Sequence, residues 1–311
     1  MDNSVLPPDD AGTPPQVLPQ TTLIICSRNR PALLADTVAS ILAGDELPAE
    51  LVIVDQSDEP HLSLMALVGE RGCTIVYRWN TSRGLSRANN EGIAAARHDL
   101  LVFTHDDVFV AADWFGTLVR ALVAAGERAL VTGQVRPTEV ERAGGFQLTL
   151  ITEPHRASYL GRIGRDVLYP LNMAVYRAAF AEIGGFDERL GPGTPFPAAE
   201  DNDFSHRTLE AGYRIVYDPA AVLYHRAWRP PQDYQRLRWA YGRGNGAYYA
   251  KYFSLHDPHM LKRMRGDLER HIRRLRGRLW AREWHEILGD LAFVGGLISG
   301  AVQWLLTQRL R

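Results

Sequence analysis

Two adjacent acidic residues, Asp106 and Asp107, directly follow the apolar segment LLVFT and His105. Neighbouring carboxylates repel each other, and burying them is costly unless a cation lies close by. Their oxygens suit Mg²⁺ or Mn²⁺, and these ions in turn bind diphosphates. The alternative is that the pair caps a helix beginning near Ala111, and the pair by itself does not decide between the two interpretations.

A second acidic cluster, EDND (200–203), follows a Gly- and Pro-rich segment, GPGTPFP (191–197). Acidic residues in a first helical turn stabilise the helix dipole, which is the structural alternative. A flexible segment before them favours a base on a mobile lid, able to take the proton of an acceptor hydroxyl. His225 ends the segment AVLYH and could complete a metal site, although a single His is more often structural.

The segment NTSRGLSRANNEG (80–92) combines a glycine with two arginines ahead of an expected helix. Gly84 frees the backbone, while Arg83 and Arg87 can meet a phosphate near the helix N-terminus. The segment matches neither the P-loop nor the dinucleotide-binding pattern, which disfavours a P-loop enzyme or a simple dehydrogenase.

The elements that position these residues alternate between strands and helices. We expect strands at 21–26, 50–55, 74–79, 100–104, 130–134 and 171–177, two further short strands at 214–218 and 221–225, and helices at 31–44, 85–96, 114–125 and 200–212. This alternation predicts an α/β fold with a mainly parallel sheet flanked by helices. Ligands bind beyond the carboxyl ends of such strands, where Ser27, Arg28, Asn29, Asp55 and the 106–107 pair lie.

The chain has 311 residues and a net charge of −1, so its overall field gives no sign of a nucleic-acid partner. Two cysteines, Cys26 and Cys73, fall in apolar segments and fit a reducing, cytoplasmic environment. Residues 1–20 are acidic and rich in proline, lack a signal-peptide pattern, and are expected to be a disordered lead. The catalytic domain is expected at 21–255 and a helical tail at 256–311.

The tail has two parts. Apolar residues recur every three or four positions from Leu261 to Leu279, and the other face is rich in arginine. Such a basic amphipathic helix suits an anionic membrane surface, or it packs on the catalytic domain with its basic face in water. The apolar stretch 291–306 is about 16 residues long and falls short of the ~20 residues that a membrane span needs. We expect a peripheral position on the cytoplasmic membrane face.

Taken in order, these motifs resemble the inverting family 2 glycosyltransferases of the GT-A fold, a Rossmann-like architecture. The resemblance covers roughly residues 21–253. It rests on Ser27-Arg-Asn, VIVDQSD, the 80–92 segment, the acidic triplet position at 105–107, and three later motifs. The later motifs are GGFDE (184–188), AAEDNDFSHRTLEAGYRIVYDPAAVLYH (198–225) and QRLRW (235–239).

The resemblance implies a nucleotide-diphosphate sugar donor, a Mn²⁺ or Mg²⁺ ion, and a glycan or lipid-linked acceptor. It implies that Asp55 holds the nucleobase or ribose, that Ser27, Arg28, Arg83 and Asp106 contact the nucleotide-sugar, and that Asp107 and His225 bind the metal. Asp201 stands at the general-base position, with Glu200 and Asp203 supporting it or contacting the acceptor. The implied mechanism is one in-line displacement with inversion.

Two positions qualify the resemblance. His105 stands where the family has the first acidic residue of the triplet, which leaves the metal's identity open and adds a possible imidazole ligand. QRLRW resembles the motif of processive synthases, in which the Trp meets the acceptor sugar. Those enzymes have several membrane spans, so we expect transfer of one or a few sugars. Trp239 is equally explained as a core aromatic residue of an amphipathic helix.

Two other functions use the same residues. A metal-dependent hydrolase or nucleotidyltransferase would need the same acids. A non-catalytic relative that binds a nucleotide or glycan is suggested only by His105.

Overall fold

The first half of the sheet is a block of parallel strands. The computed structural model describes residues 5–6, 17–65 and 71–307. The block consists of β2 (Thr21–Ser27), β3 (Glu50–Asp55), β4 (Thr74–Trp79) and β5 (Leu100–His105), in the spatial order β5-β2-β3-β4. Helices α1 (Pro31–Leu42) and α3 (Leu85–Ala95) and the short α2 (Leu62–Met65) lie in the connections. The expected βαβ pattern is confirmed, and β2, β3 and β5 are almost wholly buried because helices cover the sheet.

The second half of the sheet mixes strand directions. β9 (Asn172–Tyr176) runs antiparallel between β5 and β7 (Ala129–Pro137), and β7 pairs in parallel with β10 (Arg214–His225). β8 (Ala157–Tyr159), β1 (Val5–Leu6) and β6 (Val108–Val110) add short antiparallel pairings. Helices α4 (Trp114–Ala125), α5 (Ala178–Ile183) and α6 (Glu200–Glu210) complete the α/β domain.

One strand prediction is wrong in detail. Residues 214–218 and 221–225 were expected to be two strands, but they form the single strand β10, with a register shift between Asp218 and Val222. The extra residues bulge out, and the partner strand has Gly133 at that point. A Cβ there would lie 2.3 Å from the Ala221 carbonyl oxygen, so the close approach requires glycine. The continuous strand carries His225 directly to the carboxyl edge of the sheet.

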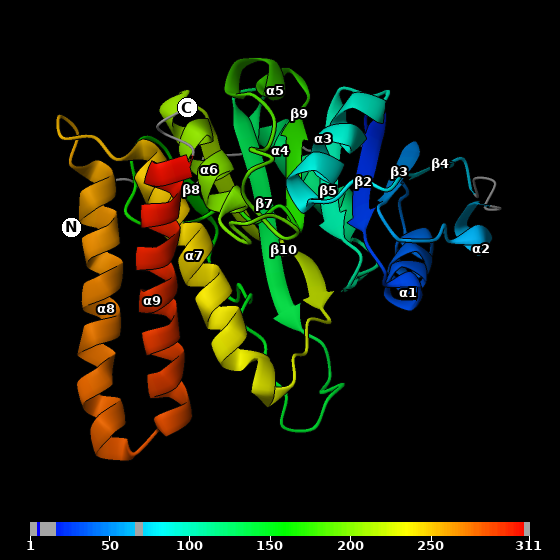
Figure 1. Ribbon diagram of the computed structural model, residues 1–311. Coiled ribbons are helices and arrows are strands. Elements are labelled where there is room, and N and C mark those ends of the chain that lie inside the picture. The colour runs from blue at the N-terminus through cyan, green and yellow to red at the C-terminus, as the bar shows by residue number, and fades with distance from the viewer. Residues whose placement is uncertain (1–4, 7–16, 66–70, 308–311) are drawn as a thin grey trace.

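Three long helices form a layer beside the sheet (Figure 1). They are α7 (Tyr234–Tyr252), preceded by the 3₁₀ turn Pro231–Asp233, α8 (His259–Ala281) and α9 (Trp284–Thr307). α7 and α9 touch through glycines on both helices. A Cβ at Gly242 or Gly246 would lie 2.0 Å from an α9 backbone oxygen, and one at Gly300 would lie 2.0 Å from the Arg243 oxygen. Small residues let the two backbones meet, so α7 is held firmly between α9 and the sheet domain.

The expected tail is therefore a helical extension, but two expectations change. The apolar stretch is part of a 24-residue helix, α9, which is long and apolar enough to cross a membrane by length and composition, with 44% of its most apolar window buried. Of the predicted disordered lead, Val5–Leu6 forms β1, while 1–4 and 7–16 lie outside the described residues. Cys26 and Cys73 are buried and free.

Candidate active site

A cavity of about 580 Å³ opens at the carboxyl ends of the central strands. Its walls come from β2, β5 and β10, from the N-termini of α3 and α6, and from α7. The predicted site residues that line it are Ser27, Arg28, His105, Asp106, Asp107, Glu200, Asp201 and His225. These residues are up to about 200 positions apart in the chain, yet they share one space. The crevice expected at the ends of the strands is thus present.

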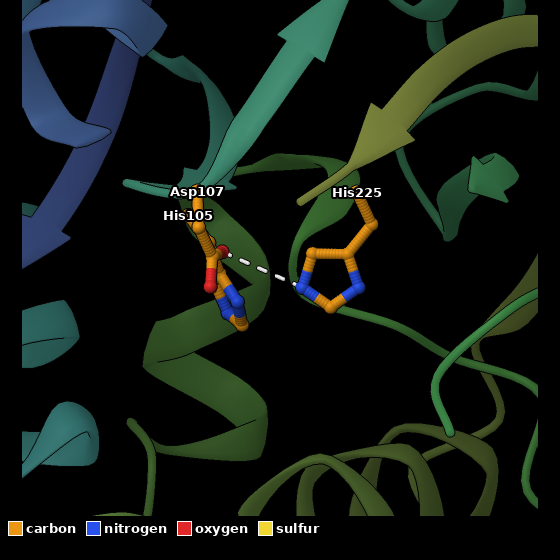
Figure 2. Close-up of side chains that lie close together, drawn as sticks. All are labelled: His105, Asp107 and His225. Atoms are coloured by element: carbon orange, nitrogen blue, oxygen red, sulfur yellow. Dashed lines mark ion pairs between the residues drawn. The ribbon is translucent and has the colours of Figure 1, made fainter. Parts of the chain in front are cut away.

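His105, Asp107 and His225 form a compact group on one side of this cavity (Figure 2). One ligand atom from each lies within 4.8 Å of the others. His225 Nε2 is 3.4 Å from Asp107 Oδ1, an oxygen that has no hydrogen-bond partner among the described residues although it is buried. Such a carboxylate oxygen beside two imidazoles fits a divalent ion. The residues that the sequence indicated for a metal are therefore brought together.

Arg30, which the sequence analysis did not single out, is the counter-charge of the acidic pair. Its Nη2 lies 2.8 Å from Asp106 Oδ1, and its Nη1 lies 2.7 Å from Asp107 Oδ2. The Ser27 hydroxyl donates to Asp106 Oδ2 at 2.6 Å. Arg30 ends the segment SRNR just after β2, so its position in that motif was the available signal. The guanidinium fixes both carboxylates while Asp107 Oδ1 stays directed toward His225.

The protonation states of this group follow from burial and charge. Burial alone would raise the pKa of Asp107, but its contact with His225 and the charge of Arg30 hold that pKa well below its usual range. Burial, partly offset by Arg30, raises the pKa of Asp106 to about 6. Burial lowers the pKa of His105 to about 4. At neutral pH the group thus offers an ionised carboxylate and a neutral imidazole, the forms that bind metals.

The second acidic pair, Glu200 and Asp201, faces the same cavity without a cation. The Asn202 amide donates to Asp201 Oδ1 at 2.8 Å. No ion pair joins either carboxylate to a basic side chain among the described residues. Burial and then the charge of Asp166 raise the pKa of Asp201 to about 6. Burial and then the charge of Asp201 raise the pKa of Glu200 to about 8. The pair is therefore more basic than ordinary carboxylates, as a proton acceptor near neutral pH should be.

The turn into α6 is held in an unusual conformation. Ala199, the residue before the helix, has φ = 71°. The 191–197 segment folds against it: Gly191 has φ = 99°, and a Cβ there would lie 3.0 Å from Glu200 Oε2. Left-handed conformations at a non-glycine residue cluster at functional sites, since the surrounding structure must compensate the strain. The Gly191 backbone thus lies directly against the Glu200 side chain, which lines the cavity.

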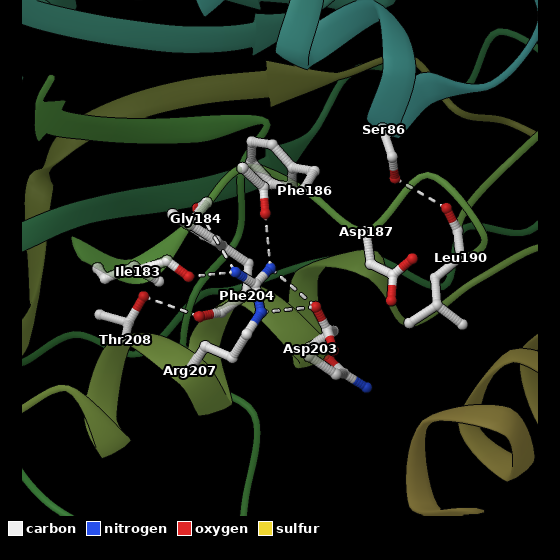
Figure 3. A network of polar contacts seen from close by, with 12 residues as sticks. Ser86, Ile183, Gly184, Phe186, Asp187, Leu190, Asp203, Phe204, Arg207 and Thr208 are labelled. Atoms are coloured by element: carbon white, nitrogen blue, oxygen red, sulfur yellow. Dashed lines mark hydrogen bonds and ion pairs between the residues drawn. The ribbon is translucent and has the colours of Figure 1, made fainter. Parts of the chain in front are cut away.

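Asp203 lies only two residues beyond Asp201 but does not line the cavity. Its side chain is fully buried and accepts hydrogen bonds from Arg207, from Lys251 and from the Tyr252 hydroxyl at 2.7 Å. Arg207 also donates to the carbonyl oxygen of Ile183 (Figure 3), and it donates to that of Gly185 at 2.8 Å. The expectation that Asp203 contacts the acceptor or supports the base directly is not supported by this geometry, because its oxygens are occupied in a network that fixes α6.

The predicted nucleotide contacts lie at different depths. Arg28 lines the cavity and pairs with Asp58 at 3.4 Å. Asp55 is buried just behind the cavity wall, where Ser57 Oγ and the Tyr77 hydroxyl both donate to it at 2.5 Å. Arg83 is exposed and precedes the lining residue Gly84. Arg28 can meet a ligand directly, whereas Asp55 does not line the cavity and holds Ser57 and Tyr77 by accepting their hydrogen bonds.

Trp239 also lies outside the cavity lining. It is 41% exposed and packs on α9, where a Cβ at Gly295 would lie 2.9 Å from its ring. The reading of Trp239 as an aromatic residue of helix packing is favoured over an acceptor contact. α7 instead lines the cavity with Leu237, Tyr241 and Asn245, and Asn202 donates to Asn245 at 2.9 Å. Their spacing of four residues was the signal that the sequence analysis missed.

Comparison with known proteins identifies the family of this chain. The family model Glycosyl transferase family 2 matches residues 22–183. A glucosyl-dolichyl phosphate glucuronosyltransferase of Haloferax volcanii is 26% identical over 229 residues, which are 70% of this chain and 72% of that protein. A pre-mycofactocin glycosyltransferase of Mycobacterium tuberculosis is 26% identical over 211 residues, 66% of this chain but only 42% of that protein.

Solved structures share the fold at low sequence identity. A mannosyltransferase from Pyrobaculum calidifontis, in complex with GDP-Man and Mn²⁺, matches with a TM-score of 0.60 and 18% identity, covering 97% of this chain and 91% of that one. TarS of S. aureus in complex with UDP-GlcNAc matches with a TM-score of 0.51 and 13% identity, covering 90% and 91%. Because the family model spans just over half of the 311 residues, the chain belongs to glycosyl transferase family 2 and is a glycosyltransferase of GT-A fold.

Proposed function

We propose that this glycosyltransferase moves a sugar from a nucleotide-diphosphate donor to a hydroxyl of a lipid-linked acceptor, with inversion at the sugar carbon. One observation carries the proposal: the His105, Asp107 and His225 group and the Asp201 carboxylate, far apart in sequence, line one cavity. The cavity volume of about 580 Å³ is within the range of small-molecule sites.

The donor's diphosphate is proposed to bind beside the imidazole–carboxylate group. Asp107 Oδ1, His105 and His225 would hold a divalent ion, and Mn²⁺ suits this ligand set better than Mg²⁺, since Mg²⁺ prefers oxygen ligands alone. When bound, the ion supplies positive charge that stabilises the departing diphosphate. Arg30 holds Asp107 and Asp106 in place, and Arg28 lines the path that the nucleotide would take.

Asp201 is proposed as the general base. The acceptor oxygen attacks the anomeric carbon as the bond to the diphosphate oxygen breaks, and the acceptor's proton passes to the Asp201 carboxylate. A base without a cationic partner keeps more proton affinity than a salt-bridged one, and Asp201 meets this requirement. Glu200, with its pKa raised to about 8, would hold a proton at neutral pH and add no second charge.

The donor and the acceptor class rest on the relatives. Solved structures of the same fold contain GDP-Man or UDP-GlcNAc, and the Haloferax volcanii relative is named for glucosyl-dolichyl phosphate, a lipid-linked sugar. A lipid-linked acceptor would bring the enzyme to a membrane surface, which we propose is the cytoplasmic face.

The test begins with a thermal-shift screen of nucleotide diphosphates with and without Mn²⁺, since a ligand that binds only the native state raises the melting temperature. Transfer from the matching nucleotide-sugar to a sugar hydroxyl of a glycosyl polyprenyl phosphate is then measured for the wild type and Asp201→Asn. We expect the variant to lose transfer by a factor of about 10²–10⁴ while nucleotide binding is kept. Unimpaired transfer by Asp201→Asn would reject the base assignment.

A further inference from the structure

An apolar surface runs along the outer side of α9 and ends at the turn between α8 and α9. Side chains spaced by three, four or seven residues share this side and are exposed: Trp284, Leu288, Leu291, Ile298, Val302 and Leu305. From Trp284 to Leu305 the stripe is about 31 Å long. At the turn, Trp280 is 92% exposed and Trp284 61% exposed. A large exposed apolar surface on a protein marks a site of contact with another protein or with a membrane.

A basic row lies on α8, which contacts α9. Lys262, Arg265 and Arg273 share the outward face of α8, and the same helical face leads to Trp280. Arg265 and Arg273 both pair with the single carboxylate of Glu269, and Lys262 has no ion pair among the described residues, so the row keeps excess positive charge. The α8 side chains Leu261, Ile272 and Leu279 are exposed as well. Apolar, aromatic and basic side chains thus occur together on these two helices.

The opposite side of α9 is built for protein packing rather than for lipid. Asp290 is 1% exposed, and its carboxylate accepts from His271 at 2.7 Å, from Arg238 at 3.2 Å and from Arg278. Gly296 and Gly300 meet the α7 backbone at the same side. A helix that crosses a bilayer alone is apolar all round, whereas α9 has one apolar stripe and a polar, packed side. α9 therefore has the form of a helix that lies along a lipid surface.

The position of the turn matters for the reaction. In Figure 1 the α8–α9 turn lies at the same end of the molecule as the arrowheads of β2, β7 and β10, which point toward the carboxyl edge of the sheet. The cavity opens at this edge. α7, packed on α9 through its glycines, supplies Tyr241 and Asn245 to the cavity wall. A surface that receives the tryptophans would thus lie on the side from which an acceptor reaches the cavity.

We propose that the α9 stripe, the Trp280–Trp284 tip and the Lys262–Arg265–Arg273 row form a docking face for an anionic lipid bilayer. The tryptophans enter the headgroup region, and the basic row pairs with lipid phosphates. This inference rests on the proposed function for its purpose, the capture of a lipid-linked acceptor, but the binding itself does not depend on catalysis. A second copy on the same face would bring two basic rows near one another, which disfavours self-association.

Vesicle co-sedimentation tests the proposal on the full chain. Vesicles of phosphatidylcholine alone are compared with vesicles that also contain phosphatidylglycerol. We expect binding to the anionic vesicles, little binding to the neutral ones, and release by high salt, because the electrostatic attraction is screened. Trp280→Ser with Trp284→Ser should weaken binding at least about tenfold. Arg265→Gln with Arg273→Gln should weaken it by about fivefold for each charge removed.

Matched controls separate location from total charge. Arg270→Gln with Arg274→Gln removes two charges from the other flank of α8 and should weaken binding less than Arg265→Gln with Arg273→Gln. Each variant should keep the nucleotide-induced thermal shift of the wild type, which shows that the cavity is intact. Asp201→Asn should bind vesicles like the wild type even though its transfer is lost, so the proposed function and the docking face can fail independently.

Three results would overturn the proposal. Equal binding to neutral and anionic vesicles by all variants would remove the role of the basic row. Retention on vesicles after high salt and alkaline carbonate would show that α9 crosses the bilayer. Absence of vesicle binding together with a stable dimer in sedimentation velocity would assign the stripe to a second copy.

Discussion

The two acidic clusters of the cavity differ in their counter-charges. Asp106 and Asp107 are joined to Arg30, and Asp107 also approaches His225. Glu200 and Asp201 face the same space, and no basic side chain among the described residues forms an ion pair with them. The two clusters therefore suit different parts of the reaction. Arg30 fixes both carboxylates of the first cluster and, together with His225, keeps Asp107 ionised as a metal ligand must be, although burial still raises the pKa of Asp106 to about 6. Glu200 and Asp201 have no such cation in the described part of the chain, and their raised pKa values give them the proton affinity that a base requires.

Asp203 lies in the same helical turn as Asp201, but like Asp106 and Asp107 it is paired with cationic side chains. We expect Asp203→Asn to destabilise the protein by about 3 kcal/mol, because Lys251 and Arg207 would lose the buried charge that they surround. Asp201→Asn should leave stability unchanged or raise it at pH 8, since its ionised form is disfavoured by burial. Urea unfolding of both variants measures the difference. Equal destabilisation would mean that the two residues are not distinct.

Arg30→Met removes the cation that pairs with Asp106 and Asp107. Two buried carboxylates would lose their cation, and we expect a loss of about 2 kcal/mol without added metal, less than for Asp203 because Arg30 is partly exposed. Added Mn²⁺ should recover part of the loss, since an ion can replace the missing charge. Arg28→Met is the matched control: its partner Asp58 is exposed, so the cost should stay below about 0.5 kcal/mol. Similar costs for both variants would contradict the role given to Arg30.

The pH dependence of transfer sharpens the same comparison. Asp201 must be ionised to act, and its pKa is raised to about 6, first by burial and then by the Asp166 charge. We therefore expect kcat/KM to fall tenfold per pH unit below about pH 6. Asp166→Asn removes a nearby negative charge and should move this fall in kcat/KM to lower pH. If kcat/KM of the wild type falls only near pH 4, or if Asp166→Asn does not move the pH at which it falls, Asp201 is not the base.

Much of the cavity could be predicted from sequence because parallel strands end at one edge. That rule places Ser27, Asp107 and the other residues at the strand ends along one edge of the sheet. It could not distinguish Asp201 from Asp203, although the helical period places residues two apart on different sides of a helix. Trp239 was likewise assigned from a motif rather than from the face of α7 that it occupies.

Other features depend on contacts that no local pattern reveals. The joining of 214–218 and 221–225 into β10 requires Gly133 on the neighbouring strand to accommodate the bulge. The close packing of α7 on α9 requires glycines of each helix to meet the backbone of the other helix, about 50 residues away in sequence. Arg30 lies within the motif that follows β2, but its ion pairs with two aspartates about 77 positions away depend on the tertiary structure.

The most direct test compares Asp107→Asn and Asp201→Asn by calorimetry of nucleotide diphosphate binding with and without Mn²⁺. The account predicts that Asp107→Asn loses the Mn²⁺-dependent part of the binding, whereas Asp201→Asn keeps it and loses only transfer. Loss of Mn²⁺-dependent binding in both variants, or in neither, would contradict the division of the cavity into a metal-binding cluster and a base.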